Sequence, residues 1–215
     1  MKRLIAIIIF VLGVGLHEIA VADTWMNVSA GATIFSIERR YSLKDKLGYN
    51  NYSGNIKYSS GPHIDVALGY YTHSFIIGGE MGYQRNNIDG IRFEKGAPDF
   101  PKDRYIYSGI IDYFRIGALV GYQGLFGRFK PLICASIGYG SQDLFANDNW
   151  LIFENFYVSG KVGALAKITD HFSLGGSVRA DYPISMLKSG EIDFLDSIKI
   201  DIMPISILLE SVFEF

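Results

Sequence analysis

The sequence predicts an all-β protein, an eight-stranded antiparallel up-and-down transmembrane β-barrel that follows a cleaved N-terminal signal peptide. Three observations lead to this fold class. The mean hydropathy is +0.18, although no apolar run is long enough for a transmembrane helix. Apolar and polar residues alternate with a period of two in eight segments, the pattern of strands with one apolar face. The connections between these segments are long and short in turn, as in a barrel threaded through a bilayer.

The N-terminus has the features of an export signal. Lys2 and Arg3 precede an apolar run that is too short to cross about 30 Å of hydrocarbon as a helix. The sequence Ala20-Val21-Ala22 then matches the small-x-small pattern of a cleavage site. We therefore expect a signal peptide over residues 1–22 and a barrel domain over residues 23–215. The alternative is that the apolar run forms a core helix.

The composition excludes several classes of function. Lys and Arg number 20 against 22 Asp and Glu, a net charge of −2 that argues against general nucleic-acid binding. The single cysteine excludes an internal disulfide framework and a zinc site made of several cysteines.

Each alternating segment has one aliphatic face and one face of Gly, Ser and charged residues. The eight segments are 26–34, 63–70, 75–84, 114–123, 129–140, 156–167, 172–182 and 206–215. The short connections are 72–74, 124–127 and 169–171, and the long polar ones are 38–61, 85–104, 141–154 and 183–197. A soluble barrel would turn its apolar face inward. Aromatic residues at the ends of the apolar face, such as Tyr70, Phe75 and Tyr182, favour instead a face in lipid with a girdle at each interface.

The polar face of these segments predicts a filled interior. An eight-stranded barrel is only wide enough for side chains to fill, and a buried charge without a partner is costly. The expected members of an interior charge network are Asp65, Glu80, Arg115, Lys130, Lys161, Arg179 and Glu210. Asp181 is expected as one further acid in the interior. Such ion pairs would plug the barrel. The alternative is a path for protons or ions.

The last segment, Ile207–Phe215, ends in an aromatic residue and has apolar residues at alternate positions before it, apart from Ser211. In this segment and in its overall pattern the chain resembles small Gram-negative outer-membrane β-barrel proteins of the OmpX, OmpA-barrel and opacity-protein type. The resemblance implies a place in the outer membrane, among its lipid and lipopolysaccharide. It also implies that Phe213 and Phe215 form the signal that the barrel-assembly machinery reads.

We expect no catalytic, metal or cofactor-binding residues. His171 and Ser173 have a spacing that resembles lipid A deacylase barrels, but they lie beside a short turn and no acid follows at a matching depth. His63 lies near a long connection, where no single strand offers it both a serine and an acid. Cys134 falls on the polar face, where a buried and unreactive thiol is expected.

The long connections are the expected place for specific binding, because loops on a rigid scaffold commonly carry it. Connection 38–61 combines basic and aromatic residues, which are frequent at interfaces. The candidate contacts to a host or surface ligand, or to lipopolysaccharide phosphates, are Arg39, Arg40, Tyr41, Tyr49 and Tyr52. A solvated loop whose bases complement an anionic leaflet is the alternative.

These expectations describe a non-enzymatic surface barrel that serves adhesion, host-factor binding or envelope integrity. Two other functions stay open. One is a narrow channel for small hydrophobic molecules of the OmpW type, which requires apolar inward surface such as Leu119, Tyr157 and Leu208. The other is an enzyme that modifies lipid A.

Overall fold

The computed structural model describes residues 24–34, 39–45, 51–72, 74–95, 109–146, 149–189, 195–200 and 204–215. These residues form eleven strands. They are β1 (Thr24–Ile34), β2 (Arg39–Asp45), β3 (Asn51–Tyr58), β4 (Gly61–Thr72), β5 (Phe75–Lys95), β6 (Gly109–Gln123), β7 (Phe129–Ala146), β8 (Asn149–Lys167), β9 (Phe172–Ser189), β10 (Leu195–Ile200) and β11 (Ile205–Glu214). No helix among the described residues is long and apolar enough to cross a membrane.

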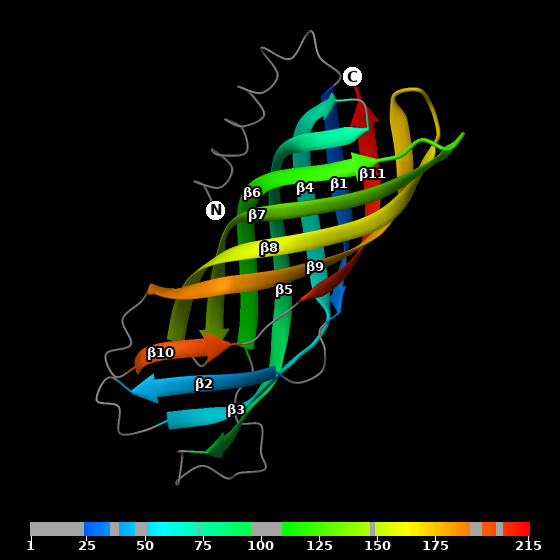
Figure 1. The fold of residues 1–215 in the computed structure, drawn as a ribbon. Coiled ribbons are helices and arrows are strands. Elements are labelled where there is room, and N and C mark those ends of the chain that lie inside the picture. The colour runs from blue at the N-terminus through cyan, green and yellow to red at the C-terminus, as the bar shows by residue number, and fades with distance from the viewer. Residues whose placement is uncertain are drawn as a thin grey trace.

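Eight of the strands close into an antiparallel barrel (Figure 1). The order around the barrel is β1, β4, β5, β6, β7, β8, β9 and β11, and β11 pairs with β1 to close the ring. When β2, β3 and β10 are left aside, each strand pairs with its neighbours along the chain, and the first and last strands pair with each other. The prediction of an eight-stranded up-and-down barrel is confirmed, and each of the eight alternating segments is one of its strands.

Three short connections lie at the end of the barrel that holds the C-terminus. They join β4 to β5, β6 to β7 and β8 to β9, as the sequence predicted. In the β6–β7 connection the backbone N–H groups of Phe126 and Phe129 each donate to the carbonyl oxygen of the other. Gly127 lies between them with a φ of 64°, a left-handed conformation that glycine adopts without steric cost.

The strands at the opposite end run much further than the sequence predicted. β5 continues to Lys95, and only residues 147 and 148 separate β7 from β8. The predicted loops 85–104, 141–154 and 183–197 are therefore wrong in part, because strand covers much of each. Above the bilayer both faces of a strand meet water, so the backbone ladder can continue without any alternation in the sequence.

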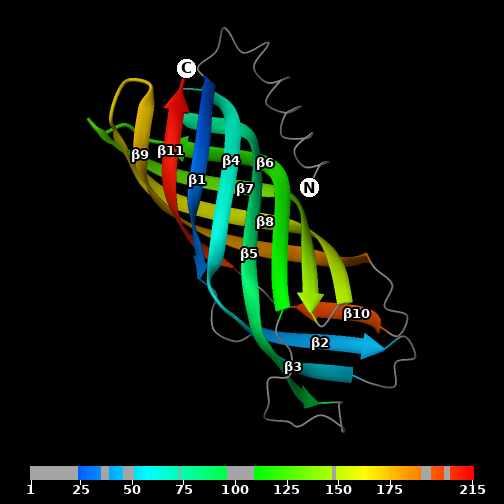
Figure 2. The same ribbon diagram turned by 180° about the vertical axis from the view of Figure 1, so that it is seen from behind.

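Connection 38–61 also departs from the prediction of a loop. It contains β2 and β3, which pair with each other, and β3 pairs with the far end of β5. β10 pairs with β2, so the sheet runs β10, β2, β3, β5. Figures 1 and 2 show β2, β3 and β10 at the end of the molecule opposite the C-terminus.

The two faces of the barrel sort as a membrane barrel requires. Large apolar side chains such as Ile77, Val120 and Val162 point outward and are more than half exposed. Polar and charged side chains point inward and are buried. An exposed apolar surface of this extent calls for lipid around it.

Candidate functional site

The lumen holds the densest group of functional side chains, and the strand register places them there. Asp65 on β4 lies across from Gly82 on β5, which in turn lies across from Arg115 on β6. Gly82 leaves space between the other two, because a Cβ atom at this position would lie 2.7 Å from Arg115 Nη2. Asp65 and Arg115 therefore form an ion pair over the glycine.

Arg179 on β9 is the centre of the network, and it is 1% exposed. Its Nη1 and Nη2 atoms donate to the two carboxylate oxygens of Glu80 at 2.7 and 2.6 Å. Its Nε donates to Asp181 Oδ1 at 2.8 Å, and a second contact of Nη2 reaches Ser159 Oγ at 2.8 Å. The bidentate pair with Glu80 is the strongest type of charge-assisted hydrogen bond.

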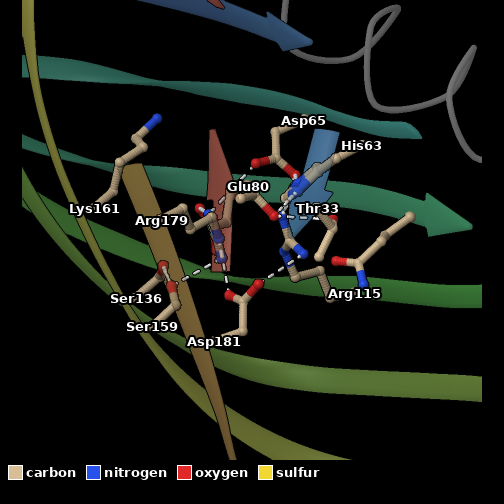
Figure 3. A network of polar contacts seen from close by, with 12 residues as sticks. Thr33, His63, Asp65, Glu80, Arg115, Ser136, Ser159, Lys161, Arg179 and Asp181 are labelled. Carbon is tan, nitrogen blue, oxygen red and sulfur yellow. Dashed lines mark hydrogen bonds and ion pairs between the residues drawn. The ribbon is translucent and has the colours of Figure 1, made fainter. Parts of the chain in front are cut away.

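Asp181 connects the two arginines into one network (Figure 3). Its Oδ2 atom accepts from Arg115 Nη1 at 3.1 Å while Oδ1 accepts from Arg179. Asp65 makes a longer ion pair of 3.7 Å with Arg179. Mutual pairing of this kind offsets the cost of removing each charge from water.

Two further ion pairs of the lumen form separately from the arginine cluster. Lys161 Nζ lies 3.4 Å from Glu210 Oε2, which also accepts from Asn27 Nδ2 at 2.6 Å. Lys130 Nζ contacts Glu214 Oε1 at 2.5 Å. Figure 3 shows Lys161 apart from the arginine cluster.

All seven interior charges named from the sequence are buried inside the barrel. The structure brings Asp65, Glu80, Arg115 and Arg179 together, whereas Lys161 and Glu210 form a second group and Lys130 joins neither. Two members of the interior network were not predicted as such: Glu214, the partner of Lys130, and Tyr157, whose hydroxyl donates to Glu80 at 3.1 Å. The only sign of this in the sequence is that both residues fall on the inward-facing positions of the alternation.

His63 joins the network in a way that no single strand could reveal. Its Nδ1 lies 2.5 Å from Ser206 Oγ on β11, and its Nε2 lies 2.9 Å from Asp65 Oδ1 and 2.5 Å from Arg115 Nη2. Serine, histidine and acid thus meet, but His63 and Ser206 are both 0% exposed. Because a guanidinium can only donate, its contact with Nε2 competes with the Asp65–His63 bond that a hydrolytic triad needs.

The structure does not join the other residues considered for catalysis. His171 Nδ1 contacts the backbone oxygen of Glu214 at 3.1 Å, while Ser173 Oγ is buried without a hydrogen-bond partner. Among the described residues, no three His, Cys, Asp or Glu side chains are grouped so that they could hold a metal ion.

The candidate ligand contacts are placed only by their backbone. Arg39, Arg40 and Tyr41 belong to β2 and Tyr52 belongs to β3. Tyr49 lies outside the described residues, as do residues 1–22 of the expected signal peptide.

An exposed ion pair joins β5 to β6 outside the lumen, beyond Tyr83 on β5. Arg85 Nε and Nη2 donate to the two oxygens of Asp112, each at 2.7 Å, and Tyr83 donates to Asp112 at 2.8 Å. The Arg85 guanidinium holds the pKa of the Asp112 carboxyl below its usual value. Asp112 lies on β6 across from Arg85 and just outside the alternating segment 114–123.

No protein-family model matches the sequence, and no curated protein is significantly similar to it. Solved structures do share its fold. The outer membrane protein OprG from Pseudomonas aeruginosa superposes with a TM-score of 0.61 at 14% identity, over 90% of this chain and 96% of OprG. Neisserial surface protein A superposes with a TM-score of 0.51 at 13% identity, over 89% of this chain and 97% of that protein. The chain therefore has the fold of the small outer-membrane β-barrels that its sequence resembles.

Proposed function

We propose that the protein is a plugged surface barrel of the outer membrane that neither conducts solutes nor catalyses a reaction, and that binds its partner through the sheet beyond the bilayer. The observation that carries this proposal is the filled lumen. Arg115, Arg179 and Tyr157 are among the largest side chains in the described part of the chain that are fully buried. Glu80 accepts from Tyr157 and Arg179, and Asp181 accepts from both arginines, so the carboxylates link these side chains inside the barrel. The interior of an eight-stranded barrel is just wide enough for side chains to fill, and these large side chains occupy it.

Single-channel recording in planar bilayers tests the plug. We expect no steady conductance near neutral pH. Arg179→Ala with Arg115→Ala should raise the conductance, because these substitutions remove two large side chains and the cations that hold the carboxylates. A steady open conductance of the unaltered protein would overturn the proposal. It would favour the channel, for which the inward-facing Leu119, Tyr157 and Leu208 already supply an apolar wall.

The binding part of the proposal rests on β2 and β3, the strands that carry the candidate residues Arg39, Arg40, Tyr41 and Tyr52. Neither strand belongs to the closed ring, so their removal leaves the barrel ladder complete. Replacing residues 39–58 with a short Gly-Ser linker should abolish binding to cells or extracellular matrix. The variant should still show the heat-dependent gel migration of a folded barrel.

Gel migration measured beside binding separates a loss of binding from a failure to fold. Unchanged binding by a variant that still migrates as a barrel would contradict the role of β2 and β3. The substitutions Arg39→Ser and Arg40→Ser test the basic residues without removing a strand, and we expect a binding loss that added salt reproduces in the unaltered protein.

The absence of catalysis is proposed for a specific reason. Ser206, His63 and Asp65 are all buried. In addition, Arg115 competes with Asp65 for His63 Nε2. Mass spectra of lipid A from cells with and without the protein should be identical. A changed acyl pattern that disappears in Ser206→Ala would overturn this part of the proposal.

A further inference from the structure

The Nε2 atom of His63 has two neighbours that require opposite proton states. Arg115 Nη2, at 2.5 Å, carries only donors, so Nε2 can accept from it only when unprotonated. Asp65 Oδ1, at 2.9 Å, is an acceptor when ionised, so Nε2 can bond to it only when protonated. One nitrogen cannot serve both, and its proton decides which contact is a hydrogen bond.

The other ring nitrogen keeps the imidazole in place in both states. Nδ1 lies 2.5 Å from Ser206 Oγ, and Ser206 Oγ lies 3.0 Å from Thr33 Oγ1. Nδ1–H can donate to Ser206 whether or not Nε2 carries a proton, and Ser206 can then donate to Thr33. Protonation therefore changes the contacts of Nε2 alone.

The ionisable side chains near His63 include more acids than bases, so one added proton changes the net charge of the set. The arginine cluster and the separate Lys161–Glu210 pair together hold four acids and three bases: Asp65 on β4, Glu80 on β5, Asp181 on β9 and Glu210 on β11, against Arg115 on β6, Lys161 on β8 and Arg179 on β9. With all of these ionised, the set carries one excess negative charge. A proton on His63 removes that excess and places a second cation against Arg115.

We propose that His63 is a proton-operated switch of the lumen, an inference that rests on the plugged barrel proposed above. At neutral pH Nε2 accepts from Arg115, and Arg115 bridges His63, Asp65 and Asp181. In acid Nε2–H donates to Asp65, and Arg115 loses its bond to the imidazole and meets a positive ring. The guanidinium then withdraws from Asp65, and the plug loosens on the side of β4 and β6. Histidine suits this role because the same ring nitrogen accepts a hydrogen bond when it is unprotonated and donates one when it is protonated.

Conductance at two pH values tests the switch. Planar bilayers with the full mature protein are recorded at about pH 7.5 and about pH 5. We expect a closed barrel at the higher pH and roughly tenfold more frequent openings at the lower pH, the change that losing one hydrogen bond to a charged group produces in an equilibrium. His63→Gln, which gains no charge in this range, should stay closed at both. The matched control His171→Gln, in a turn outside the lumen, should behave as the unaltered protein.

The outcomes distinguish the switch from the plug. A barrel closed at both pH values overturns the switch and leaves the plugged barrel standing. A barrel open at both overturns both proposals. Acid openings that persist in His63→Gln overturn the switch, since another group would then be responsible.

Nitrogen NMR of the histidine rings in the unaltered protein covers the case in which His63→Gln does not fold. We expect a ring protonated only at Nδ1 near neutral pH and at both nitrogens in acid. A buried histidine whose Nε2 keeps the same proton state across this range would overturn the switch without any variant.

Discussion

Arg179 is the single residue on which the lumen depends most, because three carboxylates share it. Glu80 and Asp181 bond to it directly, and Asp65 lies 3.7 Å away. Arg179→Ala leaves these acids buried without their cation, and we expect a loss of about 3–5 kcal/mol in the free energy of unfolding. The matched control is Arg85→Ala, which breaks an equally well-aligned but exposed pair and should cost about 1 kcal/mol or less.

Urea unfolding from lipid vesicles, followed by tryptophan fluorescence, measures both variants. Trp25 points into the barrel and is buried, so its emission reports on the closed ring. Equal and small losses for the two variants would show that the interior pairs contribute no more than a surface pair does.

Gly82 makes the Asp65–Arg115 pair possible by having no side chain. A Cβ atom there would lie 2.7 Å from Arg115 Nη2 and would also meet Asp65 Oδ1. Gly82→Ala should therefore destabilise the barrel by about 1–3 kcal/mol. Gly160→Ala is the matched control on the outer face, where a Cβ atom meets nothing within 4 Å. It should be neutral or stabilising by up to about 1 kcal/mol. Similar effects at the two positions would contradict the packing argument.

At the scale of the element, Arg85 and Asp112 tie β5 to β6 just beyond the alternating segments 75–84 and 114–123. Because the pKa of Asp112 is lowered in the folded state, the stabilisation is present above the ordinary carboxyl pKa of about 3.9 and is lost as the pH falls through the lowered value. The pair is part-exposed, so we expect no more than about 1 kcal/mol from it. Carbon NMR titration of the Asp112 carboxyl should show the low pKa, and Arg85→Ala should return it toward its ordinary value.

Arg128→Ala, in the β6–β7 turn, is the control for the removal of a distant positive charge. Asp112 should titrate in this variant as in the unaltered protein. An unchanged Asp112 pKa in Arg85→Ala would mean that Tyr83, the other donor to this carboxyl, lowers the pKa instead.

The strands also show which parts of the fold could be predicted from the sequence and which could not. Within the bilayer, lipid on one face imposes alternation, so segments such as 129–140 and 172–182 could be recognised as strands. Beyond the lipid that constraint ends, and the outer parts of β5 and β7, together with β2 and β3, read as polar loops although their backbones pair. Alternation also shows which charges face inward, but not which of them pair. The contact of His63 with Ser206 joins positions 143 residues apart, and only the closed ring brings them together.

At the scale of the whole molecule, Phe215 allows assembly in the cell to be tested separately from the stability of the folded barrel. The backbone N–H of Phe215 donates to Thr24 O at 2.9 Å and so helps to close β11 onto β1, but its side chain is 71% exposed. Phe213, by contrast, packs its ring 5.1 Å from that of Phe172. A side chain that is largely exposed and directly follows the closing strand is suited to be read by another protein, as the predicted assembly signal requires.

Phe215→Ala should therefore leave the barrel intact in the test tube and impair it in the cell. After refolding into lipid vesicles, the free energy of unfolding should change by less than about 0.5 kcal/mol, whereas Phe213→Ala should cost about 1–2 kcal/mol because a ring contact is lost. In cells, the amount of heat-modifiable barrel in the outer-membrane fraction should fall several-fold for Phe215→Ala. A matched experiment with Leu125→Ala, another exposed apolar residue at the same end of the barrel, should show no such fall. If Phe215→Ala assembled normally, Phe215 would not be part of the assembly signal, and Phe213 would remain the candidate.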